Sequence, residues 1–130
     1  MVDPNFSRVR SQRLVVWLGD SRRNLRDFPD GARKLLGDEL QLIQFGGMPK
    51  DAKAFKGVGS GVVEIALRYA SDAYRVVLAL QFGRRIYVLH AFQKKSKKGI
   101  ATTKRDLDLI KKRYAQAQEL ANENETTKRN

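Results

Sequence analysis

Two segments near the middle of the chain alternate apolar and polar side chains with a period of two. The first covers Val62–Tyr69 and the second covers Tyr74–Phe82. This period predicts two β-strands, each with one face packed on a core and the other face less apolar. Arg68 in the first strand and Arg75 in the second both fall on the less apolar face.

The connection between these strands decides which side chains face each other. A two-residue turn at Ser71-Asp72, or a four-residue loop over residues 70–73, would place Arg68 directly opposite Arg75. Like charges in that arrangement destabilise a sheet, and the planar donor groups of arginine suit phosphate oxygens. The pattern therefore predicts a phosphate-binding face. In the alternative interpretation, both arginines extend into water or pair with carboxylates such as Glu64.

A third strand follows a predicted turn at Gly83-Arg84 and ends at Phe92. The same register places His90 opposite Val77 and Phe92 opposite Arg75. His90 and Phe92 are therefore expected on the face that holds the arginines.

Apolar residues recur at helical spacing in three other parts of the chain. Asp20 and Ser21 are suitable caps for a short helix that stops before Pro29. Pro29 suits the first turn of a second helix, which ends at Gly46-Gly47, and a last helix begins at Thr102/Thr103. We expect the first two helices to cover the apolar face of the sheet.

These elements predict an α+β fold, in which a small, mostly antiparallel sheet has two N-terminal helices on one face and a C-terminal helix. Arg13–Leu18 is interpreted as an edge or first strand, and Met48–Gly61 as a connector rich in glycine and lysine. The length predicts a single domain over residues 13–121. A basic lead-in over residues 1–12 precedes it, and a polar tail over residues 122–130, expected to be disordered, follows it.

Charge narrows the class of partner. The 130 residues include 26 Lys and Arg against 14 Asp and Glu, which gives a formal net charge of +12. Such a charge attracts polyanions, so nucleic acid or the ribosome is the leading partner class. An ordinary basic protein, or a positive surface neutralised by an acidic protein partner, is the alternative.

Composition also bounds the location and the cofactors. The chain has no cysteine, no apolar run long enough to span a membrane and no apolar core of a signal peptide near its start. We therefore expect a cytoplasmic protein without a membrane partner. With one histidine and no spaced carboxylate cluster, the sequence predicts no metal site.

The candidate chemistry gathers around the face that holds the arginines. RNA cleavage without a metal needs a base for the 2′-hydroxyl proton, an acid for the departing 5′-oxygen and cations that stabilise the charge on phosphorus. The histidine could be the acid or the base, a lysine could be the base instead, and a histidine on a strand is often purely structural. The candidate catalytic residues are Arg68, Arg75, His90, Lys94 and Lys95. The candidate RNA-binding residues are Lys56, Phe92 (by stacking on a base), Lys97, Lys98 and Lys104.

Four stretches of the sequence carry a resemblance to a known family. They are Gly59–Ile65, Tyr74–Val76, Tyr87–Ser96 and Lys104–Ile110, and the run Leu-His-Ala-Phe-Gln-Lys-Lys inside the third is the most specific. With these motifs, residues 13–120 resemble the phage-derived, HigB-type branch of the RelE/ParE toxin superfamily. The resemblance implies a compact sheet packed against two N-terminal helices, with a further helix at the C-terminus.

The resemblance also implies a function. It implies the toxin of a type II toxin–antitoxin system, a metal-independent endoribonuclease (mRNA interferase) that cuts mRNA in the ribosomal A site. The implied partners are the ribosome, mRNA and a helix-turn-helix antitoxin, and no small-molecule cofactor is implied.

The family's motif residues carry over to five places in this chain. The arginine before the hairpin corresponds to Arg68, the Tyr-Arg dipeptide after it to Tyr74-Arg75, and the basic loop to Lys94-Lys95. His90 and Lys56 correspond less securely. These are therefore the positions for which the resemblance implies a functional role.

One position departs from the family's pattern, and the superfamily itself has more than one function. Thr103 stands where this branch often has proline, so the last helix can begin differently here. Catalytic residues also vary across the superfamily, whose fold does not name one function. A ParE-like toxin that inhibits DNA gyrase, and a non-catalytic nucleic-acid-binding or ribosome-binding protein, are the alternatives.

Overall fold

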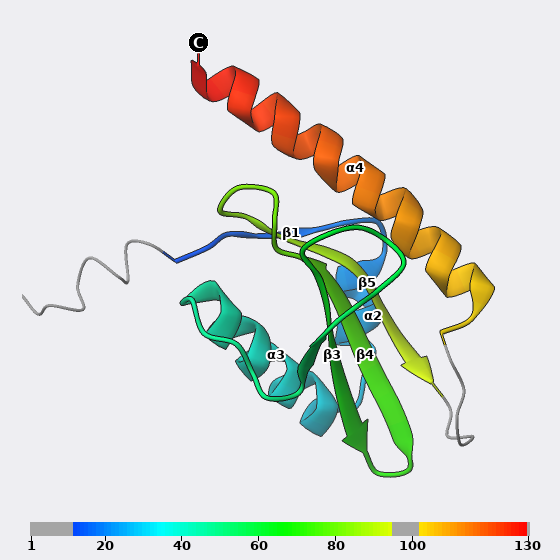
Figure 1. Ribbon diagram of the computed structural model, residues 1–130. Helices are drawn as coiled ribbons and strands as arrows, with labels where there is room; N and C mark the ends of the chain where they lie inside the picture. The colour runs from blue at the N-terminus through cyan, green and yellow to red at the C-terminus, as the bar shows by residue number, and fades with distance from the viewer. Residues whose placement is uncertain (1–11, 95–101, 130) are drawn as a thin grey trace, which may run out of the picture.

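The computed structural model describes residues 12–94 and 102–129, which form a five-stranded sheet and three helices (Figure 1). The strand order is β1-β5-β4-β3-β2, with β1 parallel to β5 and the other neighbours antiparallel. The strands are β1 Val15–Trp17, β2 Ala52–Ala54, β3 Val62–Tyr69, β4 Asp72–Ala79 and β5 Ile86–Lys94; the helices are α2 Ser21–Arg26, α3 Asp30–Gln44 and α4 Lys104–Arg129. This architecture confirms the predicted α+β fold.

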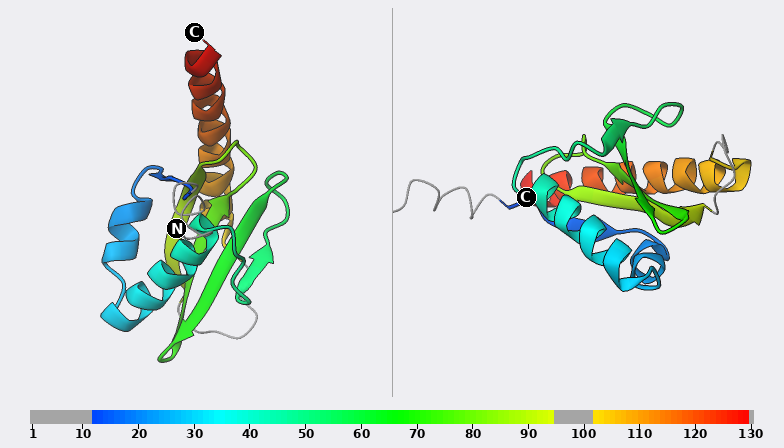
Figure 2. Two further views of the ribbon diagram at one scale, coloured as in Figure 1. Left: turned by 90° about the vertical axis from the view of Figure 1, so that its left-hand side faces the viewer. Right: turned by 90° about the horizontal axis from the view of Figure 1, so that it is seen from below.

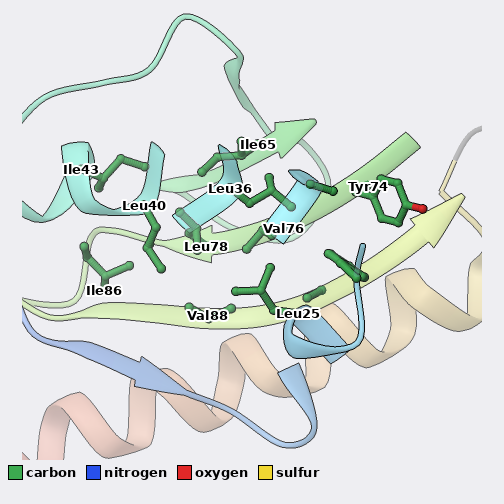
Figure 3. Close-up of a cluster of buried hydrophobic side chains, with 13 residues drawn as sticks. Leu25, Leu36, Leu40, Ile43, Ile65, Tyr74, Val76, Leu78, Ile86 and Val88 are labelled. Atoms are coloured by element: carbon green, nitrogen blue, oxygen red, sulfur yellow. The ribbon is translucent and has the colours of Figure 1, made fainter. Parts of the chain in front are cut away.

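Helices cover both faces of the sheet (Figure 2). On one face, apolar side chains of α2 and α3 pack against the strands, as Figure 3 shows for Leu25, Leu36, Val76 and Val88. On the other face, α4 packs through Ile110 and Ala117. The strand residues in that second cluster are Val62, Val77, Ala79, Tyr87, Leu89 and Phe92. The two N-terminal helices therefore cover the predicted apolar face, and α4 covers part of the opposite face.

The helix ends follow the sequence signals closely. Pro29 is the N-cap of α3, and the helix ends just before Gly46, whose φ of 91° suits glycine. Before α4, the Thr103 hydroxyl accepts a hydrogen bond from the Asp106 backbone N–H at 3.2 Å and donates to its Oδ2 at 2.8 Å. The first of these bonds is an N-cap hydrogen bond, and it supplies the helix start without proline. α4 also includes residues 122–129, for which the polar sequence predicted a tail.

The β3–β4 register differs from the predicted one. The strands are joined through Ala70 and Ser71, with Tyr69 paired to Asp72, so Arg68 lies opposite Ala73 rather than opposite Arg75. Ala70 adopts a φ of 57°, which allows the chain to reverse before the predicted Ser71-Asp72 turn. Because the register shifts by an even number of residues, both arginines remain on the same face of the sheet.

The β4–β5 register is the predicted one near the candidate residues. His90 pairs with Val77, and Phe92 pairs with Arg75. Beyond Val77 the register shifts and leaves Leu89 as the extra residue of a β-bulge. Strand β4 ends at Ala79 and strand β5 begins at Ile86, so the connection between them is longer than the predicted Gly83-Arg84 turn.

The connector Met48–Gly61 is more ordered than its composition indicates. It contains β2, whose residues pair with β3 and add an edge strand to the sheet. Its later part reaches α4, where the Tyr114 hydroxyl donates to the Ser60 carbonyl oxygen at 3.2 Å. A Cβ atom on Gly59 would lie 2.4 Å from the Tyr114 ring, so glycine is required for this approach. Within residues 12–94 and 102–129, no helix combines the length and apolarity needed to cross a membrane.

Candidate functional site

Strand pairing places three charged residues on a diagonal across the face that α4 partly covers. The first is Glu64 on β3, which pairs with Val77 on β4, two residues from Arg75. Arg75 in turn pairs with Phe92 on β5, two residues from Lys94. Each step to the next strand therefore moves the charged residue two positions along the sheet. We call the surface formed by Glu64, Ala66, Arg68, Ala73, Arg75 and Lys94 the basic face. The two alanines leave space between its charged side chains.

Arg75 lies at the middle of this diagonal. Its Nη1 donates a hydrogen bond to Glu64 Oε2 at 3.1 Å, and the two side chains are 24% and 12% exposed. The structure therefore contains the carboxylate pairing that the sequence left as an alternative. The buried Nε of Arg75 has no hydrogen-bond partner among the described residues. Because Nε is buried, an anionic ligand would meet the exposed part of the guanidinium, whose side chain is 24% exposed.

Lys94 is buried at the end of the diagonal, with 8% of its surface exposed. Burial lowers the pKa of the Lys94 ammonium group, and the positive charge of Arg75 acts in the same direction. The carboxylates of Glu64 and Asp106 oppose this shift. A lysine in such surroundings gives up its proton more readily than a lysine in water.

His90 lies beneath α4 and is only 5% exposed. Its Nε2 is 2.9 Å from Asp106 Oδ1, and its Nδ1 is 3.4 Å from Nη1 of Arg113. Because a guanidinium can only donate, Nδ1 must accept, and the ring proton is on Nε2, which donates to Asp106. The Phe92 ring stacks on the imidazole, with centroids 4.7 Å apart and an interplanar angle of 16°. Both ring nitrogens of His90 are thus committed inside the protein.

Arg113 is a buried residue that was not among the predicted site residues. It is 7% exposed and also donates to the Leu89 carbonyl oxygen at 3.0 Å and to Asp20 Oδ1 at 2.7 Å. The hydrogen bond from Arg113 is the largest cause that lowers the pKa of Asp20. We call Asp20, His90, Asp106 and Arg113 the buried network. The signal that could have revealed it is the place of Arg113 on the apolar stripe of α4, three residues after Ile110.

Asp20 therefore has a different role from the predicted one. It occupies the N-cap position of α2, but its side chain makes no capping hydrogen bond. The carboxylate binds Arg113 instead, because that cation is buried and needs a compensating charge.

The other candidate residues are more dispersed. Arg68 is exposed at the end of β3, Lys56 is exposed in the loop after β2, and Lys104 is exposed at the first position of α4. Phe92, expected to stack on a base, is 8% exposed and packs within the second core cluster. Lys95, Lys97 and Lys98 lie outside the described residues. Throughout the described ranges, no three His, Cys, Asp or Glu side chains are grouped to hold a metal ion.

Comparison with known proteins gives a family. A family profile described as phage derived protein Gp49-like (DUF891) matches residues 23–115, well over half of the chain. The matched range contains all residues of the basic face and three of the four residues of the buried network. A search of curated proteins gave no significant match. The chain therefore belongs to the Gp49-like phage-derived family, a RelE-like toxin family of toxin–antitoxin systems.

Proposed function

We propose that the protein is the toxin of a type II toxin–antitoxin system and that it cleaves mRNA on the ribosome without a metal ion. Family membership supports the toxin role. The single observation that supports cleavage is the environment of Arg75, which lies on the diagonal between Glu64 and Lys94 with its side chain 24% exposed. This arrangement offers two cations to a single phosphate.

The reaction is an attack of the ribose 2′-oxygen on the adjacent phosphorus, with departure of the 5′-oxygen. Negative charge develops on the phosphoryl oxygens in the transition state. Arg75 and Lys94 would stabilise that charge, and one preorganised donor of this kind contributes about 10²- to 10³-fold in rate. Arg68, exposed at the end of the same face, would bind a neighbouring phosphate.

The surroundings of His90 favour a structural role for this residue in the mechanism over a role in proton transfer. Its ring is buried, and its two nitrogens are bonded to Asp106 and Arg113. We propose that His90 holds the start of α4 against β5, and that Lys94 and Arg75 contact the RNA. Lys56 and Lys104 would bind backbone phosphates at the rim, and Lys95, Lys97 and Lys98 remain candidates on sequence alone.

The proposed partners follow from the same function. A net charge of +12 favours association with ribosomal and messenger RNA through a strongly salt-dependent interaction. A helix-turn-helix antitoxin would neutralise the toxin, and both would act in the cytoplasm.

Arg75→Ala tests the proposal, with Arg22→Ala as the matched control. Arg22 is an exposed arginine on α2, outside the basic face. After brief induction, growth, mRNA 5′ ends and sedimentation with ribosomes are measured. The proposal expects the wild type and Arg22→Ala to cut translated messages, and Arg75→Ala to bind ribosomes without cutting.

Other outcomes identify the alternatives. Loss of ribosome binding together with loss of growth arrest in Arg75→Ala would indicate a non-catalytic binding protein. Growth arrest by the wild type with intact messages, unchanged in Arg75→Ala, would indicate a gyrase-directed toxin and would contradict the proposal.

A further inference from the structure

Glu64 is a carboxylate inside the basic face of a strongly basic protein. Its side chain is 12% exposed, and its Oε2 accepts a hydrogen bond from Arg75 at 3.1 Å. On the strand next to it, Lys53 lies directly opposite. A carboxylate has about four acceptor positions, so the bond to Arg75 leaves Glu64 able to accept a further proton or hydrogen bond.

The other candidate bases near Arg75 are less suited to accept a proton from RNA. The Nδ1 of His90 accepts from Arg113, and its Nε2 donates to Asp106 beneath α4. Asp106 itself accepts from both His90 and Thr103. Lys94 lies near the charges of Arg75, Glu64 and Asp106. The proposed function already uses it as a cation, a role that requires the protonated form.

The position of Glu64 on the diagonal fits the geometry of the reaction. Attack on phosphorus and departure of the leaving group occur on opposite sides of the phosphorus atom. A base and an acid must therefore lie on opposite sides of the group that holds the phosphate. Glu64 and Lys94 flank Arg75 in this way, because they lie on the two neighbouring strands and are displaced in opposite directions along the sheet.

We propose, on the basis of the proposed function, that Glu64 is the general base and Lys94 the general acid of RNA cleavage. A Glu64 carboxylate oxygen takes the 2′-hydroxyl proton while the 2′-oxygen forms a bond to phosphorus. The bond from phosphorus to the 5′-oxygen breaks, and the Lys94 ammonium group gives a proton to that oxygen. The products are a 2′,3′-cyclic phosphate and a 5′-hydroxyl, with no oxidant, metal or co-reactant consumed.

A purely positioning role for Glu64 is the competing interpretation. In that role the carboxylate only orients the guanidinium of Arg75. Glu64→Gln separates the two roles, because the amide oxygen can still accept the hydrogen bond from Arg75 but is a much weaker base. Asp38→Asn is the matched control, since Asp38 is an exposed carboxylate on α3, outside the basic face.

The experiment measures single-turnover cleavage of a ribosome-bound mRNA by the full-length protein. Two mRNAs are compared, one natural and one with sulfur in place of the 5′-oxygen at the mapped cleavage position. A thiolate leaves without a proton, so the sulfur substrate does not need the general acid. Ribosome binding, the pH dependence of the rate and the melting temperature are recorded for each variant.

The proposal predicts a different pattern for each residue. Glu64→Gln should lose about 10²- to 10⁴-fold in rate on both mRNAs and lose the acidic limb of the pH–rate profile, with ribosome binding unchanged. Lys94→Met should lose rate on the natural mRNA and recover most of it on the sulfur substrate. Asp38→Asn should match the wild type. If Glu64→Gln does not fold, Glu64→Asp should retain the acidic limb with a reduced rate.

Three results would overturn the assignment while leaving the proposed function intact. These are a Glu64→Gln rate within about fivefold of the wild type, recovery of Glu64→Gln by the sulfur substrate, or a Lys94→Met defect equal on both mRNAs. Failure of the wild type to cut any mRNA would instead refute the proposed function.

Discussion

Arg113 Nη1 lies 3.4 Å from His90 Nδ1, so a permanent cation faces the acceptor nitrogen of the only histidine. The same guanidinium bonds Asp20 and the Leu89 carbonyl oxygen, which joins the start of α2, strand β5 and helix α4. A single side chain therefore connects three elements from distant parts of the sequence. Its partners would be left unsatisfied in its absence.

Arg113→Met should destabilise the fold by about 3 to 5 kcal/mol, because the change leaves buried acceptors and the Asp20 carboxylate without their cation. Urea unfolding at neutral pH measures the effect. Arg105→Met, at an exposed position on α4, is the control and should change stability by less than about 0.5 kcal/mol. A loss of less than about 1 kcal/mol for Arg113→Met would contradict the structural role of the network.

His90 should hold its proton on Nε2, because Nδ1 accepts from Arg113 and Nε2 donates to Asp106. Nitrogen-15 correlation spectra of the imidazole ring at pH values above its titration distinguish the two neutral tautomers directly. Arg113→Met should weaken this preference without reversing it, because the Asp106 carboxylate still accepts from Nε2. A ring with its proton on Nδ1 would refute the assigned hydrogen-bond directions.

Gly19→Ala should destabilise the protein by about 1 to 3 kcal/mol for two reasons. Gly19 has a φ of 54°, which alanine adopts at a cost, and an added Cβ would lie 2.4 Å from an Arg113 nitrogen. Thermal unfolding of Gly19→Ala and of the double variant with Arg113→Met measures the coupling. Since the added Cβ would clash with Arg113, Gly19→Ala should cost less stability in the Arg113→Met background than in the wild type. Strictly additive losses of stability would contradict the clash.

Glu39 should make stability depend on pH near neutrality. Burial, and then a hydrogen bond and charge repulsion from Asp51, raise the pKa of Glu39 from 4.5 to about 7. Because the pKa of Glu39 is higher in the folded state than in the unfolded state, its contribution to stability is complete at pH values below the unfolded-state pKa. That contribution is lost as the pH rises through about 7. The shift corresponds to at most about 3 to 4 kcal/mol, and solvent screening reduces that figure.

Glu39→Gln tests this dependence, because the amide does not titrate. The variant should be more stable than the wild type at about pH 8 and should lose this advantage at about pH 5. Denaturant titrations at both pH values, with Glu119→Gln as an exposed control on α4, give the comparison. An equal difference between variant and wild type at both pH values would rule out titration of Glu39 as the cause.

Much of the fold follows from local patterns in the sequence. The period of two over β3–β5 predicts which side chains share a face, and the pairing of His90 with Val77 and of Phe92 with Arg75 is confirmed. The helix start at Thr103 is also a local signal, because its capping partner is three residues away. Such features depend on neighbours in the chain and can be read without the fold.

The buried network could not be predicted in the same way, whereas the pairing of Arg75 with Glu64 was one of two alternatives that the sequence left open. The turn through Ala70 has no glycine or asparagine to mark it, so the direct opposition of Arg68 and Arg75 was a wrong prediction. Arg113 and Asp20 are 93 residues apart, and only the packing of α4 on the sheet brings them together. Burial of His90 likewise depends on α4, which the strand pattern does not reveal.

The contact between Asp20 and Arg113 has a consequence for synthesis of the protein. Its two partners are among the earliest and latest parts of the described fold, and closing so long a loop is slow and comes after local contacts. The buried network can close only after Arg113 has left the ribosome. A nascent chain that stops before this residue lacks the guanidinium that joins Asp20 to the Leu89 carbonyl oxygen.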